Sequence, residues 1–270
     1  MSTTPELHDA IPPREIARKV EELGVVKAHT DTLTLLVLAV LAGAFISLGA
    51  LLFTVVITDP TLGFGITRLI GGLSFCLGLV LVVVAGAELF TGNNLIAMAW
   101  ASGRIGLRAV LRNWILVYIG NVIGCLGTVA LALWAGLDGL ADGAVGETAV
   151  NLARGKAELP VAEAFARGIL CNALVCLAVW LAMGGRSVAD KIFALLFPIT
   201  AFVAIGLEHS IANWFFLPFG MALNAAEVSL SASLWNLLSV SAGNIVGGTL
   251  LVSGVYWTAY LRSERLRKEE

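Results

Sequence analysis

Six long stretches without an Asp, Glu, Lys, Arg or His side chain constrain this sequence more than any other feature. They lie at residues 33–57, 69–87, 113–137, 168–185, 192–207 and 235–261. A helix needs about 20 apolar residues to cross a bilayer core, and the shorter stretches adjoin further apolar sequence. Only 13% of the 270 residues are charged, against about a quarter in soluble domains. The sequence therefore predicts an all-α membrane protein with six transmembrane helices, and no basic, aromatic-rich patch indicates nucleic-acid binding.

The polar segments predict how the chain is divided. We expect a cytoplasmic N-terminal segment at residues 1–30 with an amphipathic helix at 13–23, a six-helix membrane domain at 31–262, and a cytoplasmic tail at 263–270. The polar start lacks the apolar core of a cleavable signal peptide. With the N-terminus inside, most Lys and Arg residues fall in cytoplasmic segments, as the positive-inside rule requires. This predicts a multi-pass protein of the cell membrane with both termini in the cytoplasm.

The chain also contains an internal repeat. The polar sequence GAELFTGNN interrupts the second apolar span at 86–94, and GLEHSIAN interrupts the fifth at 206–213. The pattern G-N-x-x-G recurs in the third and sixth spans, at 120–124 and 243–247. Because each unit has three helices, its two copies must enter the membrane from opposite sides. The sequence therefore predicts two inverted three-helix repeats with helices 2 and 5 interrupted.

The two predicted interruptions indicate a binding site near the membrane midplane. Breaks at matching places of two inverted halves are the best sequence pointer to such a site. Unpaired backbone groups are tolerated at this depth only where protein or a water-filled cavity satisfies them. The N-termini of half-helices also present N–H groups and a positive dipole end, which suit an anion.

The ionisable residues at the interruptions have different expected roles. His209 is the one histidine inside a predicted span, and ionisable groups in membranes mark ion or proton pathways. We expect Glu88 and Glu208, with the matching Asn93 and Asn213, to be structural, the carboxylates accepting free N–H groups of helix ends. Composition alone describes Lys156 as a solvated lysine of a long outer loop.

Two motifs give the chain a family resemblance. The E-L-F-T segment at 88–91 and the E-H-S-I-A-N segment at 208–213, with residues 170–180 and 243–247, resemble the formate/nitrite transporter family. The likeness extends over roughly residues 20–261. It implies an aquaporin-like six-helix protomer with its own pore, assembled as a homopentamer. It also implies an anion channel or transporter, for formate first and nitrite next, and not an enzyme.

The same resemblance implies roles for individual residues. His209 matches the central pore histidine, and Thr91 matches the polar residue that hydrogen-bonds near it and moves with a gating loop. Lys156 matches a lysine that makes the outer vestibule positive, and Asn172 a pore-lining asparagine. Hydrophobic constrictions are implied on the outer side by Phe75 and Leu79, and on the inner side by Leu89, Phe90 and Phe202.

A proton-coupled mechanism follows from these roles as a hypothesis. An anion crossing apolar rings loses hydration, and a protonated His209 could stabilise it or donate a proton, so that flux changes near a pH of about 6.5. No cofactor, metal site or catalytic residue is expected. Ser210 and the sequence after Thr91 leave hydrosulfide, acetate or lactate open as the transported species. A neutral-solute pore of the aquaporin type is the other alternative, although its Asn-Pro-Ala boxes are absent.

Overall fold

The computed structural model describes residues 10–58 and 60–263, and this part of the chain consists of helices and their connections. Six helical stretches are long and apolar enough to cross a membrane. They are α2 (Thr32–Ile57), α3 (Phe64–Val80) continued by the π-helical segment η1 (Leu81–Gly86), α5 (Leu107–Trp134), α7 (Val161–Gly184), α8 (Val188–Ile205), and α10 (Leu230–Val246) continued by η4 (Gly247–Gly254) and α11 (Val255–Tyr260). The predicted six-helix, all-α membrane protein is confirmed.

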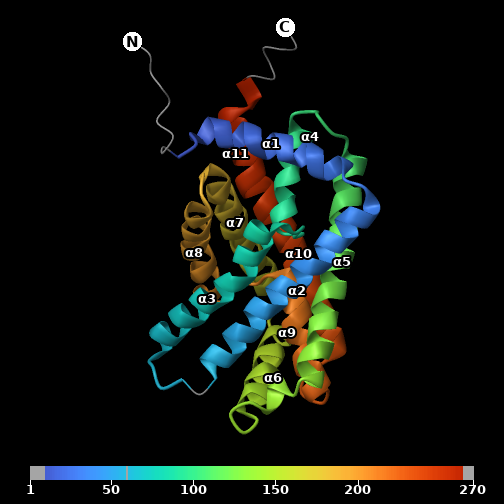
Figure 1. Cartoon of the computed structure of the whole chain (residues 1–270). Coiled ribbons are helices and arrows are strands. Elements are labelled where there is room, and N and C mark those ends of the chain that lie inside the picture. The colour runs from blue at the N-terminus through green and yellow to red at the C-terminus, as the bar shows by residue number, and fades with distance from the viewer. Residues whose placement is uncertain (1–9, 59, 264–270) are drawn as a thin grey trace.

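Helix α1 (Pro13–His29) lies across one end of the bundle (Figure 1). The sequence predicts a helix only to residue 23, but it continues for another turn and a half because its buried stripe continues, through Gly24 to Ala28. This extra length holds Lys27. The predicted terminal segments lie partly outside the described residues, at 1–9 and 264–270.

Glycines allow the helices of each half to approach closely. In the first half α5 packs on α2, and a Cβ on Gly124 would lie 2.0 Å from the carbonyl oxygen of Val40. In the second half α10 and η4 pack on α7, and a Cβ on Gly247, the first residue of η4, would lie 2.1 Å from the carbonyl oxygen of Ile169. Small residues are the usual means of close helix contact in membranes. The repeated G-N-x-x-G pattern is thus a helix-packing motif in both halves.

Two helical runs stop inside the bundle and resume after a few residues. The first ends at Gly86 (φ +86°) and resumes with η2 (Gly92–Ile96) and α4 (Ala97–Ala101). The second ends at Gly206 (φ +84°) and resumes with α9 (Ser210–Leu223). Glycine favours this left-handed conformation because it has no Cβ. Figure 1 shows α4 at the end where α1 lies, and α9 at the opposite end.

The segment before α7 is a helix and not the loop expected from the sequence. After the short turn η3 (Leu137–Gly139), α6 (Ala144–Ala157) packs against α9 at the end of the bundle opposite α1 (Figure 1). Its buried side carries small apolar residues at intervals of four, namely Val145, Ala149, Ala153 and Ala157. That spacing is the sequence signal for a helix. Lys156 therefore sits in the last turn of a packed helix.

Candidate functional site

His209 connects the two helix interruptions. It is the N-cap residue of α9, and its ring Nδ1 accepts the backbone N–H of Ala212 at 3.1 Å. Its Nε2 lies 3.0 Å from the hydroxyl oxygen of Thr91, in the other interruption. Both side chains are buried. A nitrogen that accepts a hydrogen bond carries a lone pair, so this pattern assigns a neutral ring with its proton on Nε2, donated to Thr91.

Glu208 is the centre of a polar network beside His209. Its carboxylate accepts one hydrogen bond from the Lys156 ammonium at 2.9 Å and one from the Asn213 amide at 2.6 Å. The same Asn213 nitrogen donates to Asn236 Oδ1 at 2.8 Å, and Asn236 donates to the backbone oxygen of Lys156 at 2.8 Å. The network therefore closes on itself and ties α6, α9 and α10 to the interruption.

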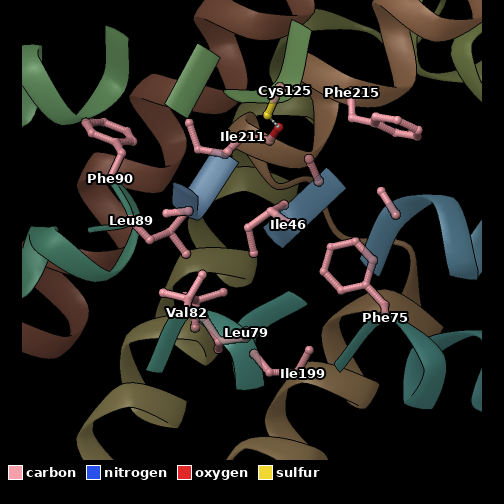
Figure 2. Close-up of a cluster of buried hydrophobic side chains, with 14 of the residues drawn as sticks. Ile46, Phe75, Leu79, Val82, Leu89, Phe90, Cys125, Ile199, Ile211 and Phe215 are labelled. Atoms are coloured by element: carbon pink, nitrogen blue, oxygen red, sulfur yellow. Dashed lines mark hydrogen bonds between the residues drawn. The ribbon is translucent and has the colours of Figure 1, made fainter. Parts of the chain in front are cut away.

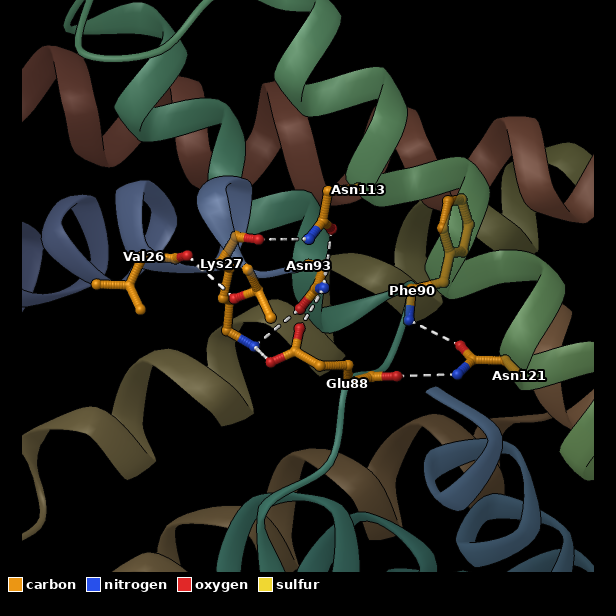
Figure 3. A network of polar contacts seen from close by, with 8 residues as sticks. Val26, Lys27, Glu88, Phe90, Asn93, Asn113 and Asn121 are labelled. Carbon is orange, nitrogen blue, oxygen red and sulfur yellow. Dashed lines mark hydrogen bonds and ion pairs between the residues drawn. The ribbon is translucent and has the colours of Figure 1, made fainter. Parts of the chain in front are cut away.

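The first interruption carries the same network (Figure 3). The Glu88 carboxylate accepts from the Lys27 ammonium at 2.6 Å and from the Asn93 amide at 2.6 Å. Asn93 donates to Asn113 Oδ1 at 3.0 Å, and Asn113 donates to the backbone oxygen of Lys27 at 3.1 Å. Each half thus supplies one lysine, one glutamate and two asparagines with these four bonds in common, and Lys27 of α1 is the counterpart of Lys156 of α6. The first network has one bond more, because Lys27 also donates to Asn93 Oδ1 at 3.1 Å.

A further pair of buried asparagines holds the non-helical backbone. Asn121 accepts the Phe90 N–H at 2.9 Å and donates to the carbonyl oxygens of Ala39 and Glu88 at 2.7 and 2.9 Å. Asn244 makes the matching bonds with the Ser210 N–H (2.9 Å), the Gly168 oxygen (2.8 Å) and the Glu208 oxygen (3.0 Å). These amides supply the partners that exposed backbone groups need at membrane depth.

The glutamates therefore act differently from the prediction. They were expected to accept free N–H groups of half-helices, whereas the structure pairs both carboxylates with a lysine and an asparagine side chain. Asn121, Asn244 and the His209 ring accept the backbone N–H groups instead. A neutral amide provides donor and acceptor together, and so it can satisfy both backbone groups of a non-helical turn. A carboxylate cannot.

Two cavities lie on opposite sides of the interruptions. The α1-end cavity has a volume of about 310 Å³, and its lining includes Lys27, Glu88, Leu79 and Leu89. The α6-end cavity has a volume of about 250 Å³, and its lining includes Lys156, Glu208, His209, Phe75 and Phe202. Among the described residues, none lines both cavities. A barrier of packed side chains therefore separates them.

Apolar side chains form this barrier. Phe75 and Phe202 meet edge to face at 5.6 Å between ring centroids, and Phe202 stacks on His209 at 5.9 Å. Figure 2 shows Leu79 beside Val82, with Leu89 close above them. Leu79 therefore groups with Leu89, and Phe202 with Phe75, which differs from the predicted pairing. The reason is that α3 and α8 run in opposite directions. Leu79, late in α3, therefore lies toward the α1 end, whereas Phe202, late in α8, lies toward the α6 end.

Three expected pathway residues, Thr91, Phe90 and Asn172, line neither of these cavities. Thr91 is buried and contacts His209. The Phe90 ring contacts Tyr118 edge to face at 4.9 Å between centroids. Asn172 is buried among helices, where its amide donates to Asn94 Oδ1 at 2.9 Å and to the Asn244 carbonyl oxygen at 2.7 Å. The structure places Phe90 and Asn172 in contacts that support the first interruption.

Sequence reasoning also missed part of the site. Lys27 has no local motif, and its role follows only from the structural match of α1 with α6. Asn113 and Asn236 carried a signal, because they recur at the same distance before the G-N-x-x-G pattern of each half.

Comparison with known proteins shows which family has this architecture. The family profile described as "Formate/nitrite transporter" matches residues 14–258. The formate channel FocA of Escherichia coli (strain K12) is 40% identical over 273 residues, covering 94% of this chain and 96% of that protein. The uncharacterized transporter YrhG of Bacillus subtilis (strain 168) is 41% identical over 260 residues, covering 95% and 96%.

A solved structure agrees with these sequence matches. It is described as a "Pentameric formate channel with formate bound", has a TM-score of 0.79 and 37% identity, and aligns with 86% of this chain and 98% of its own. The fold, the extent of the profile match and the sequence identities agree over nearly the whole chain. The chain therefore belongs to the formate/nitrite transporter family, as its two motifs predict.

Proposed function

We propose that this chain is a channel for formate and related small monovalent anions, with one pathway through each protomer of a homopentamer. Relatives named as formate channels, and a pentameric neighbour with formate bound, support the substrate and the assembly. We also propose that it lies in the cell membrane with both termini in the cytoplasm, which the distribution of Lys and Arg supports. The observation that carries the proposal is the Thr91–His209 hydrogen bond, which joins the two interruptions between two lysine-bearing cavities.

The lysines bring the anion to each side of the barrier. Lys156 donates to Glu208 and also lies 5.2 Å from the centre of the Phe216 ring. An ammonium group has three donors, so pairing with one carboxylate leaves donors for a ligand in the cavity. The glutamate fixes the lysine in place, and the lysine offers the anion a partner before it loses its hydration. In the other cavity Lys27 donates to Glu88 and also to Asn93 Oδ1 at 3.1 Å, so it keeps one of its three donors for a ligand.

His209 and Thr91 provide the polar step within the barrier. An anion that leaves water for an apolar passage faces a large desolvation penalty. The Nε2–H of His209 donates to the Thr91 hydroxyl oxygen. When an anion separates them, both can donate to its oxygens. A neutral histidine is sufficient for this role, which differs from the protonated histidine of the sequence hypothesis.

Proton uptake by His209 would alter α9. The Nδ1 lone pair accepts the Ala212 N–H, and a proton on Nδ1 would place two donors against each other. Protonation therefore requires the ring to turn or the first turn of α9 to loosen. We propose that this is the origin of pH-dependent flux and of any coupling to protons.

Flux into proteoliposomes tests the proposal. Formate, nitrite, hydrosulfide, acetate and lactate are compared at one pH above and one below about 6.5, with glycerol as the neutral-solute control. We expect formate and nitrite to pass and glycerol to be excluded. His209→Gln, which keeps a donor but does not titrate, should retain flux and lose its pH dependence, whereas His209→Phe should lose most flux. Fast glycerol entry, or unchanged pH dependence in both variants, would refute the proposal.

A further inference from the structure

Each cavity contains its own copy of the lysine–glutamate–asparagine network, but the linings of the two cavities differ in charge. The α1-end cavity is lined by one basic and one acidic side chain, Lys27 and Glu88, among the residues described. The lining of the α6-end cavity contains Arg68 and Arg167 in addition to the matching pair Lys156 and Glu208. The inverted repeat therefore gives two similar vestibules of which only one has excess positive charge.

Of the two added cations, Arg68 is half-buried and contacts the second interruption. Its Nε donates to the carbonyl oxygen of Ala204 at 3.0 Å, and its Nη2 donates to that of Val203 at 2.6 Å. Its guanidinium carbon lies 5.9 Å from the centre of the Phe53 ring. Arg167, in contrast, forms an exposed ion pair with Glu163 on its own helix, and exposed pairs of this kind contribute little.

The carbonyls that Arg68 binds belong to the last turn of α8. The C-terminal carbonyls of a helix lack the regular helical partner and carry partial negative charge. Here the Val203 carbonyl also accepts the Gly206 N–H at 3.1 Å. At this position these carbonyls would repel an anion that enters the α6-end cavity. Arg68 binds two of them and brings a full positive charge to the same place. The end of α8 is thereby made attractive to an anion.

The local backbone makes room for this side chain. Gly206 ends α8 with φ +84°, and a Cβ at this position would lie 3.2 Å from Arg68 Nη2. The first interruption also turns at a glycine, Gly86 with φ +86°, yet the described lining of its cavity contains no arginine. The arginine is therefore an addition to one half of the repeat.

We propose that Arg68 is a second anion-binding residue of the α6-end vestibule, where it holds a carboxylate or similar small oxyanion before the anion reaches Lys156 and His209. A guanidinium has five N–H donors in a planar fork that matches two oxygens. Among the described contacts two of the five are used, which leaves three for a ligand. The inference rests on the proposed anion conduction and adds a direction to it, because the α6 end should collect anions at lower concentration than the α1 end.

Zero-trans uptake of labelled formate into right-side-out and inverted membrane vesicles tests this asymmetry. Maleimide labelling of a cysteine at the exposed position 231 (Ser231→Cys) establishes which vesicles present the α6 end. In the wild type, the half-saturating concentration should be lower for entry from the α6 end. Because salt screens such charges, the difference should shrink as ionic strength rises. Equal values from the two sides, or a lower value from the α1 end, would overturn the proposal before Arg68 is substituted.

Substitutions then assign the effect to Arg68. Arg68→Gln should raise the half-saturating concentration from the α6 end about threefold to tenfold and change entry from the α1 end less than twofold. Arg68→Lys should restore part of the loss. Arg104→Gln removes a cation from an exposed pair with Glu21 at the other end and should change neither value. A loss of equal size from both sides would show that Arg68 only supports the fold.

The two proposals can fail separately. If vesicles take up nitrite or another anion but not formate, the formate assignment fails, and the Arg68 comparison is made with the permeant anion. If formate passes with equal half-saturation from both sides, the channel proposal stands and the Arg68 inference fails. If no anion passes, both fail.

Discussion

The paired asparagines Asn121 and Asn244 allow a quantitative test of the repeat. Alanine at position 244 would remove the partners of the N–H of Ser210, the first residue of α9, and of the Glu208 carbonyl in the non-helical backbone before it. A buried polar group left without a partner costs roughly 1–3 kcal/mol, so Asn244→Ala should destabilise the fold by about 2–6 kcal/mol. Asn121→Ala removes the partners of the matching groups in the first half. Its cost should therefore be similar.

Reversible unfolding in mixed detergent micelles, followed by tryptophan fluorescence, measures both costs. The matched control is Asn151→Ala, which removes an exposed amide that accepts a bond from Arg154 and should change stability by less than about 0.5 kcal/mol. The reasoning is refuted if either buried variant costs less than about 1 kcal/mol. It is also refuted if one half tolerates the change and the other does not, because the two asparagines would then not be equivalent.

Three further outcomes follow from local geometry. Gly124→Ala should lower the melting temperature strongly, since its Cβ would lie 2.0 Å from a backbone oxygen of α2 and overpacking costs about 1–3 kcal/mol. A melting temperature equal to that of the wild type would contradict this contact. Gly206→Ala should cost about 1–2 kcal/mol for its left-handed backbone alone, measured by the same unfolding assay, and a neutral result would argue against the positive φ. The pKa of Asp31 is lowered by the hydrogen bond from the Thr34 backbone N–H at the start of α2. Its contribution to stability is therefore present above its ordinary pKa of 3.8 and lost as pH falls through the lower folded-state pKa. Asp31→Asn should flatten the dependence of the melting temperature on pH in that range. An unchanged pH profile of the melting temperature would contradict it.

The fold could be predicted because its causes are local in the sequence. Stretches without charge mark the membrane helices, since each must be long and apolar for the same physical reason. The similar motifs around Glu88 and Glu208, at matching places of the second and fifth spans, predict the repeat. Helix α6 was missed because it is short and its buried stripe consists mostly of alanine, which gives little contrast with its polar face.

The site was only partly predictable because its decisive contacts join distant segments. The sequence places His209 and Thr91 at interruptions, but their hydrogen bond depends on the packing of α3 against α8. Lys27 lies in a polar helix that resembles a surface element until it is seen to face Glu88. The family resemblance implied that Asn172 lines the pore, whereas in the structure its amide bonds to Asn94 and to the Asn244 carbonyl oxygen. In each case the missing information was which distant segments of the chain contact one another in the folded structure.

The central claim is that an anion passes between His209 and Thr91 where two interrupted helices meet. A structure of the protein with bound formate would test it most directly. The account predicts α8 ending at Gly206, and formate within hydrogen-bond distance of His209 Nε2 and the Thr91 hydroxyl. A continuous helix from α8 into α9, or formate bound only at a site remote from these two side chains, would contradict it.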